Sequence, residues 1–131
     1  MKKNRKRALL VRVAADQSNK GGNWNGPVDS KTNKFVYVPI PDDGPFHPDF
    51  VTAYKSWHPY LTSPWNGLSP HLHHRNMHLD PDFKHLTYGD GGERAKQIQS
   101  KLGPGDLLVF YAGLRDVHSN PRLIYAIIGL Y

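Results

Sequence analysis

Apolar residues gather in four short runs whose spacing predicts strands. ALLVRVA (residues 8–14) is continuous except for one arginine, and FVYVPIP (35–41) alternates aromatic and β-branched residues. DLLVFYA (106–112) and LIYAIIGLY (123–131) are the most hydrophobic segments. Runs of this kind are typical of strands, and the most apolar strands lie at the centre of a sheet. We therefore predict that the last two strands are central and that residues 35–41 form an edge, because proline cannot donate to a ladder.

The clearest helical pattern lies just after Asp90. Its apolar positions recur at spacings of three and four residues and are Ala95, Ile98 and Leu102. Such spacing places these side chains on one face of a helix. Asp90 and Glu93 have the separation of a capping box. The pattern predicts a helix over residues 91–102, with Asp90 as its cap.

The pattern is weaker in the middle of the chain. Pro48 could open a short helix that Pro59 would stop. Residues 59–88 show no period, and an ordered loop of this length often carries function. Together the patterns predict an α+β domain over residues 8–131, with a mixed, partly barrel-like sheet, one main helix and long loops. Because the chain stops inside the last predicted strand, either this strand ends the sheet or the domain is truncated at its C-terminus.

The charge of the chain is concentrated at one end. Five of the 17 basic residues lie in MKKNRKR, and the remaining 12 nearly balance the 11 acidic residues. Residues 1–7 are therefore a basic, flexible arm that either contacts phosphate or only solubilises the terminus. The lack of cysteine excludes disulfides, thiolate zinc sites and cysteine nucleophiles. No stretch reaches the ~20 apolar residues of a membrane span, so we expect a cytoplasmic protein with no membrane partner.

Six motifs follow one another along the chain in an order that resembles a known family. They are GG..NGPV, FVYVPIPD, HLDPDF, YGDGGERAKQI, GPGDLLVFYAGLR and IYAIIGLY. Their order resembles the nucleotide modification associated domain, third family, which comprises bacterial and phage proteins found beside systems that modify DNA bases. The helix, the GPGD turn and the strand after it are also similar, more weakly, to the PUA-like barrels of ASCH and EVE domains, which hold modified bases or RNA. The resemblance implies an association with nucleotides or DNA.

HLHHRNMHLDPDF (71–83) holds four of the eight histidines. Residues two apart share one side of an extended segment, and imidazole with carboxylate suits zinc, manganese or iron(II). One interpretation is a divalent metal site formed by His71, His73, His78 and Asp80. A second is a polar pocket for a ligand, with His78 and Asp80 foremost and Asp82 behind them. A third is a structural turn, in which the aspartates accept local hydrogen bonds.

Loop tryptophans and their asparagine neighbours are further ligand-binding candidates. Trp24 with Asn25, and Trp65 with Asn66, could give a base a flat wall and polar groups that read its edge. The alternative for each tryptophan is packing beneath a long loop. Arg115, expected just past a strand, could bind a phosphate or a carboxylate; the alternative is an ion pair with Asp106 or Asp116.

The favoured function is binding of a nucleotide or modified nucleobase, in DNA or free, as an accessory to DNA modification or phage defence. A first alternative is a metal-dependent hydrolase or transferase acting on nucleotides, with His78 as the base and Asp80 orienting it. A second alternative is a protein-interaction module whose partner the sequence does not identify. Binding is favoured over catalysis, and a divalent metal is the one cofactor considered.

Overall fold

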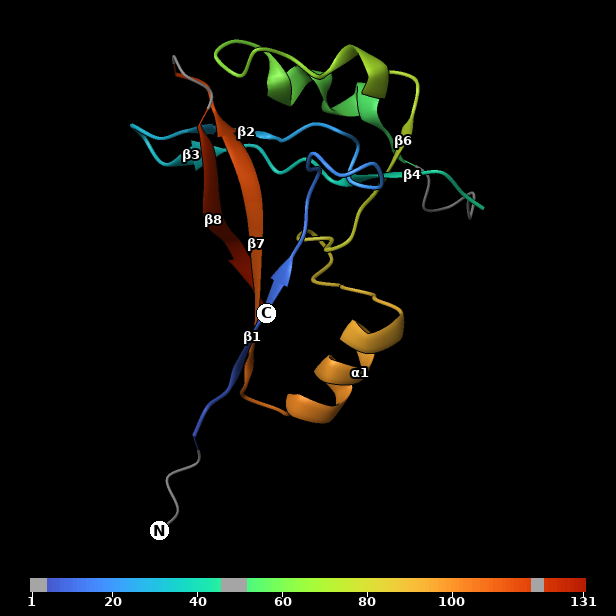
Figure 1. Cartoon of the computed structure of the whole chain (residues 1–131), viewed down its shortest axis with the longest axis vertical. Coiled ribbons are helices and arrows are strands. Elements are labelled where there is room, and N and C mark those ends of the chain that lie inside the picture. The colour runs from blue at the N-terminus through green and yellow to red at the C-terminus, as the bar shows by residue number, and fades with distance from the viewer. Residues whose placement is uncertain (1–4, 46–51, 119–121) are drawn as a thin grey trace.

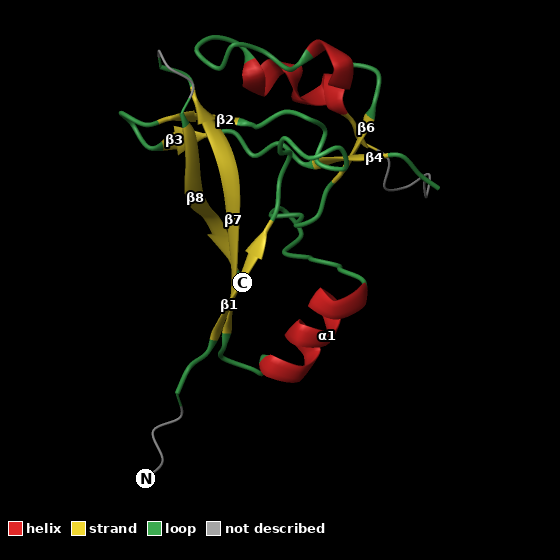
Figure 2. Ribbon diagram, viewed as in Figure 1, coloured by secondary structure: helices red, strands yellow, loops and turns green. Residues whose placement is uncertain are grey.

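The computed structural model describes residues 5–45, 52–118 and 122–131, which form two sheets and one α-helix with short 3₁₀ segments (Figure 1). The five-stranded sheet contains β1 (Ala8–Arg12), β2 (Pro27–Asp29), β3 (Lys34–Phe35), β7 (Leu107–Asp116) and β8 (Leu123–Leu130). The three-stranded sheet contains β4 (Ile40–Asp42), β5 (Thr52–Ala53) and β6 (Asn76–His78). The helical elements are η2 (Tyr54–Leu61), η3 (Pro70–Leu72) and α1 (Gly92–Lys101). The 3₁₀ segments and α1 lie at opposite ends of the molecule (Figure 2). The predicted α+β fold with one main helix is confirmed, but the described strands do not close into a barrel.

β7 is the central strand of the larger sheet. It pairs in parallel with β1 and, further along, with β2, and it pairs antiparallel with β8 from Val109 to Arg115. Because β8 occupies one edge of β7, β1 and β2 share the other edge. The predicted central position is therefore right for β7 and wrong for β8, which pairs with no other described strand. β7 is also longer than predicted, so Arg115 lies inside the strand and not past its end.

α1 matches the predicted helix within one residue at each end, but its cap differs. Its N-cap is Gly91, where no described side chain accepts a hydrogen bond from the helix. The carboxylate of Asp90 instead accepts a hydrogen bond from the Tyr88 hydroxyl, and Glu93 accepts one from Lys96. The capping box was therefore a wrong prediction, and the first turn of α1 keeps backbone N–H groups without a side-chain partner.

Residues 35–41 do not form the single strand that their alternation predicts. Phe35 ends β3 in the larger sheet, whereas Ile40 begins β4 in the smaller one. Proline at positions 39 and 41 supplies no N–H donor, which limits how far a ladder can continue. The predicted helix start at Pro48 lies outside the described residues. Pro59 lies within η2 and does not stop it, so that prediction was wrong.

Aromatic packing holds the long segment before α1 against the larger sheet. Phe110 on β7 is fully buried and contacts the rings of Phe83, Tyr88 and Tyr131 at centroid separations of 5.8, 5.1 and 4.9 Å. Edge-to-face contacts at these separations add to the stabilisation from burial. The polar residues between Phe83 and Tyr88 and their neighbours are thus fixed relative to β1 and β7. None of the described helices is long and apolar enough to cross a membrane.

Candidate functional site

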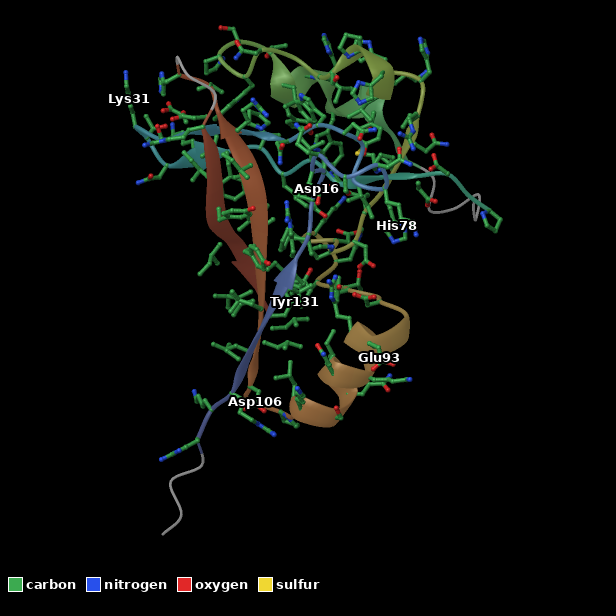
Figure 3. The ribbon with its side chains drawn as sticks, in the orientation of Figure 1. Asp16, Lys31, His78, Glu93, Asp106 and Tyr131 are labelled. Carbon is green, nitrogen blue, oxygen red and sulfur yellow. The ribbon has the colours of Figure 1, made fainter. Side chains whose placement is uncertain are left out.

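His78 and Asp80, the strongest candidates from the sequence, line one cavity of about 790 Å³. Three segments far apart in the sequence enclose it: the end of β1 with the loop after it, the end of β6, and the segment that leads into α1. Its polar lining side chains are Arg12, Asp16, Ser18, Lys20, His78, Asp80, Tyr88, Asp90 and Arg94. We call this cavity the polar pocket. Asp16, in the loop after β1, and His78, at the end of β6, both lie above α1 in the view of Figure 3.

His78 lies between two carboxylates. Its Nδ1 is 3.4 Å from Asp42 Oδ2, and its Nε2 is 3.4 Å from Asp80 Oδ2. The register explains the first contact, because His78 pairs with Ile40 on β4 and Asp42 lies two residues further along the same face. Met77 points to the opposite face and is buried in the core. An imidazole held between two acceptors can keep or transfer a proton at either nitrogen.

The carboxyl group of Asp80 is partly buried beside His78. Burial raises its pKa above the usual range, and this effect outweighs the hydrogen bond from the Gly89 amide and the influence of His78. The Gly89 N–H donates to Asp80 Oδ1 at 2.8 Å, so one oxygen is already used. Oδ2 remains beside His78, and a protonated Asp80 can donate a hydrogen bond there.

The segment before α1 carries a second group of polar side chains. The Tyr88 hydroxyl donates to the Asp90 carboxylate, and Arg94 Nη1 lies 3.4 Å from Asp90 Oδ2. Burial, followed by the neighbouring Asp90, raises the pKa of Tyr88 to about 12, so its hydroxyl stays protonated at neutral pH. Gly89 and Gly91 line the same wall, next to the first turn of α1. A guanidinium group and the first amides of α1, which no described side chain caps, therefore lie together on one side of the polar pocket.

The opposite wall is the loop that follows β1. Asp16 closes this loop, since its backbone N–H donates to the Gly21 carbonyl and its carboxylate accepts hydrogen bonds from Ser18. Arg12 Nη2 lies 3.5 Å from Asp16 Oδ2, and its guanidinium lies over the Tyr125 ring, 5.5 Å from the centroid. The contacts fix Arg12 at the edge of the sheet, where it sets the position of Asp16.

Sequence reasoning missed the Arg12–Asp16 and Asp90–Arg94 pairs as parts of a site. One signal was present for the first pair: Arg12 is the only charged residue in the apolar run that forms β1. A signal for the second was the run Gly89-Asp90-Gly91-Gly92 directly before a helix, which is typical of a segment that brings backbone close to a ligand. Asp42 gave no local signal, because only the pairing of β4 with β6 brings it to His78.

Asp82 organises its own loop and does not line the polar pocket. Its Oδ1 accepts the Lys84 amide at 2.9 Å, and its Oδ2 lies 2.7 Å from His85 Nδ1. The hydrogen bond with His85 holds the pKa of Asp82 below its usual range. Asp80 therefore faces the polar pocket, and Asp82 makes the local hydrogen bonds expected of a structural turn. Asp82 also lines a smaller cavity of about 500 Å³, which it shares with His78.

Four other predicted ligand-binding residues lie away from the polar pocket. Trp24 packs against the core cluster beneath η2, which consists of the buried residues Ala15, Val38, Tyr54, Leu61, Leu68, Leu72 and Met77. Asn25 is buried, and its side-chain amide donates to the Gly113 carbonyl at 2.7 Å. This hydrogen bond holds the segment before β2 against β7. Asn66 occupies a turn with a φ of 64°. Arg115 lies in β7; the carboxylates considered as its partners bind elsewhere, Asp106 to Arg7 and Asp116 to Ser30.

The residues considered as metal ligands are not brought together. His71 Nε2 lies 2.6 Å from the Gly22 carbonyl oxygen, and His73 Nε2 lies 3.2 Å from that of Leu68. Each of these histidines thus hydrogen-bonds the backbone of its own surroundings, whereas His78 and Asp80 face the polar pocket. Within residues 5–45, 52–118 and 122–131, no three His, Asp or Glu side chains form a group that could hold a metal ion.

Trp65 lines a second cavity, of about 620 Å³, which has a different character. Rings form its walls, and its lining residues are Asn33, Lys34, Phe35, Val36, Tyr37, Trp57, Tyr60 and Trp65. We call it the aromatic pocket. Trp65, a predicted ligand-binding residue, lines this pocket together with Trp57, and its role in binding stays a prediction.

The comparisons with known proteins identify the family of the chain. The model of the family described as Nucleotide modification associated domain 3 matches residues 7–130. No curated protein and no solved structure matches. The match includes both walls of the polar pocket and the whole aromatic pocket. The chain belongs to the Nucleotide modification associated domain 3 family.

Proposed function

We propose that the polar pocket binds a nucleotide or a modified nucleobase, and that this binding serves a DNA-modification or phage-defence system. The observation that carries the proposal is that Arg94 and the start of α1 share one cavity with His78 and Asp80. A volume of about 790 Å³ lies within the range of cavities that hold small molecules. The family description supports an association with nucleotide modification.

The side of the pocket next to α1 suits a phosphate group. The first amides of a helix attract an anion, and at Gly91 no described side chain caps them. Arg94 lies in the first turn of the helix, and Lys20 lines the pocket from the opposite loop. A guanidinium group binds phosphate through two parallel hydrogen bonds. On binding, phosphate oxygens would replace the Asp90 carboxylate as the partner of Arg94.

The side next to β6 suits the edge of a base. His78 can donate or accept a hydrogen bond at Nε2, and Asp80 can accept one or, when protonated, donate one at Oδ2. Carboxylates accept from exocyclic amino groups of bases, and a neutral carboxylic acid can also meet a ring nitrogen. Asp80 and His78 therefore offer both donor and acceptor atoms to a base edge.

The position of His78 also favours a second candidate, a reaction on the bound nucleotide with His78 as the general base. Asp42 beside Nδ1 would orient the imidazole and stabilise its protonated form, as a carboxylate does for a catalytic histidine. Incubating the protein with nucleotides and separating the products by chromatography tests this candidate. Turnover that His78→Gln abolishes without loss of binding would support it, and unchanged nucleotides would contradict it.

Isothermal titration with deoxynucleoside mono- and triphosphates, including 5-hydroxymethyl derivatives, tests binding. Arg94→Gln should weaken the affinity at least about tenfold, because one charge-assisted phosphate contact is worth about 1.5–3 kcal/mol. Lys96→Gln is the matched control, since Lys96 is on the same helix, pairs with Glu93 and does not line the pocket. Its affinity should change less than twofold. Equal effects of the two variants, or no binding of any of these nucleotides, would contradict the proposal.

A further inference from the structure

The aromatic pocket is a second candidate binding site, separate from the polar pocket. We propose that it binds an unpaired base of single-stranded DNA by stacking. Its volume of about 620 Å³ is within the range of ligand cavities, and five of its lining residues are aromatic. Every base has a π-face, so aromatic platforms bind single strands with little dependence on sequence.

The walls of the aromatic pocket are held in place before any ligand arrives. Trp57 Nε1 donates to the Tyr37 carbonyl at 2.7 Å, and the Tyr37 hydroxyl donates to the Pro81 carbonyl at 3.1 Å. Trp57 and Trp65 both pack against the core cluster beneath η2. Because the polar atoms of Trp57 and Tyr37 are already bonded within the protein, their rings present mainly stacking surface.

One ring projects further into solvent than the others. Tyr60 is 63% exposed, and its ring meets that of Trp57 edge-on at a centroid separation of 5.7 Å. An exposed tyrosine pays little for desolvation on folding and gains contact area when a base covers it. Tyr60 is therefore the residue that can be changed with least effect on the fold.

The charge around the aromatic pocket fits a phosphate backbone. The pocket is lined by residues 33–37, Trp57, Tyr60 and Trp65, and no aspartate or glutamate lines it. The basic residues next to these segments are Lys31, Lys34 and Lys55, whereas Arg75 is paired with Asp43. Asp29, the ladder partner of Lys34, is bonded to Thr32 and His118. Lys34 lines the pocket, and Lys31 lies at the outer end of the β2–β3 hairpin (Figure 3). Lysines beside a stacking platform are the combination that single-strand binding requires.

The choice of a DNA strand over a peptide follows from the same lining, because Lys34 lies among the rings and no aspartate or glutamate lines the pocket. The lining requires no 2′-hydroxyl, so a DNA strand offers every group that the pocket can bind. The inference does not depend on the nucleotide proposed for the polar pocket, because no residue lines both cavities.

Fluorescence anisotropy with a labelled eight-nucleotide dT strand tests the proposal, with tryptophan emission as the readout at the site. Binding should quench tryptophan emission, and Tyr60→Leu should weaken affinity about fivefold or more, the loss expected for one stacked base. Tyr125→Leu is the matched control: Tyr125 is 59% exposed, lies on β8 and does not line the aromatic pocket. Its affinity should stay within twofold. Lys34→Gln should reduce the slope of log K against log salt by about 0.7.

Three results would overturn the proposal. The first is that the dT strand does not bind, and the second is that Tyr125→Leu weakens binding as much as Tyr60→Leu. The third is that a proline-rich peptide binds as tightly as dT. Arg94→Gln separates this proposal from the previous one, because it should weaken mononucleotide binding at least about tenfold and leave the effect of Tyr60→Leu on dT unchanged. Loss of mononucleotide binding alone would thus bear on the polar pocket only.

Discussion

The two pockets of this protein are built in opposite ways. The polar pocket depends on loops whose backbone is tied by side-chain carboxylates, as Asp16 ties the loop after β1 and Asp80 ties Gly89. The aromatic pocket depends on rings packed against a core cluster. Hydrogen-bonded loops place charges accurately but yield to a small steric change, whereas a packed aromatic wall resists the loss of one polar contact.

The pockets are joined by one side chain. The Tyr37 ring lines the aromatic pocket, and its hydroxyl bonds to the carbonyl of Pro81, directly after Asp80. Burial, with a smaller contribution from Asp80, raises the pKa of Tyr37 well above its usual value, so the hydroxyl remains a donor at all physiological pH values. Removing the Tyr37 hydroxyl should therefore affect ligand binding in the polar pocket and leave binding in the aromatic pocket unchanged.

The largest effect should come from the loop of the polar pocket. In Gly21→Ala, the new Cβ would overlap the Asp16 carboxylate and lie within 2.7 Å of Ser18 Oγ. We expect a loss of about 1–3 kcal/mol in the free energy of unfolding, the cost typical of overpacking, and weaker mononucleotide binding. Denaturant unfolding measures the first and isothermal titration the second.

Gly91→Ala is the control for this change. Gly91 lines the same pocket, but nothing lies within 4 Å of an added Cβ, and its φ is −109°. Its free energy of unfolding should change by less than about 1 kcal/mol, because alanine restricts the unfolded chain but is a poorer N-cap than glycine. If both alanine variants lose stability equally, the loop after β1 is not held by Asp16 in the way its hydrogen bonds indicate.

A smaller effect should follow from cutting the link between the pockets. Tyr37→Phe removes the hydrogen bond to Pro81 and leaves a carbonyl without its partner, which should cost about 1 kcal/mol. Mononucleotide binding should weaken because Asp80 loses a neighbouring anchor, and binding of the dT strand should not change because the ring remains. Thermal unfolding and the two binding assays measure these effects.

Tyr54→Phe is matched to this change, since the Tyr54 hydroxyl is buried and donates to the Pro39 carbonyl. It should lower stability to a similar extent and leave mononucleotide binding unchanged. Weaker binding in both variants would mean that the effect of Tyr37 is one of general stability.

Sequence and structure agree where a local pattern decides the outcome. Periodicity was sufficient for β1, β7, β8 and α1, since each is set by its own alternation or helical spacing. The pairing of strands was not predictable, and His78 meets Asp42 only through the register of β4 with β6. His78 and Asp80 could be identified as candidates from their chemistry, but Arg94 needed the packing of Phe83 and Tyr88 on Phe110 to be placed near them.

The N-cap of α1 is the opposite case, because here a local sequence pattern predicted the wrong residue. Asp90 has the local spacing of a cap, but Tyr88 and Arg94 draw its carboxylate into the pocket, and Gly91 takes the cap position. A competing interaction in the folded protein therefore overrode a local preference. Such departures are expected where a site is formed, and this one leaves the amides that the proposed phosphate would meet.

The smallest predicted effect is the pH dependence that Asp80 gives to the polar pocket. Burial raises its folded-state pKa above the value of the unfolded chain, so the folded protein binds this proton more tightly. Its contribution to stability is thus fully present below the unfolded pKa of about 4 and is lost as pH rises through the folded pKa. Asp80→Asn cannot ionise and keeps an oxygen for the Gly89 amide, so its stability should fall less over this interval.

Thermal unfolding of both proteins across this pH range measures the difference. Binding of the dT strand provides the internal comparison, because Asp80 does not line the aromatic pocket. The substitution should leave the pH dependence of that binding unaltered. Parallel stability curves for the two proteins would show that Asp80 titrates as an ordinary surface carboxyl group. Its Oδ2 would then be only an acceptor at every pH well above about 4, and at neutral pH the polar pocket would accept only donor groups of a base edge at this position.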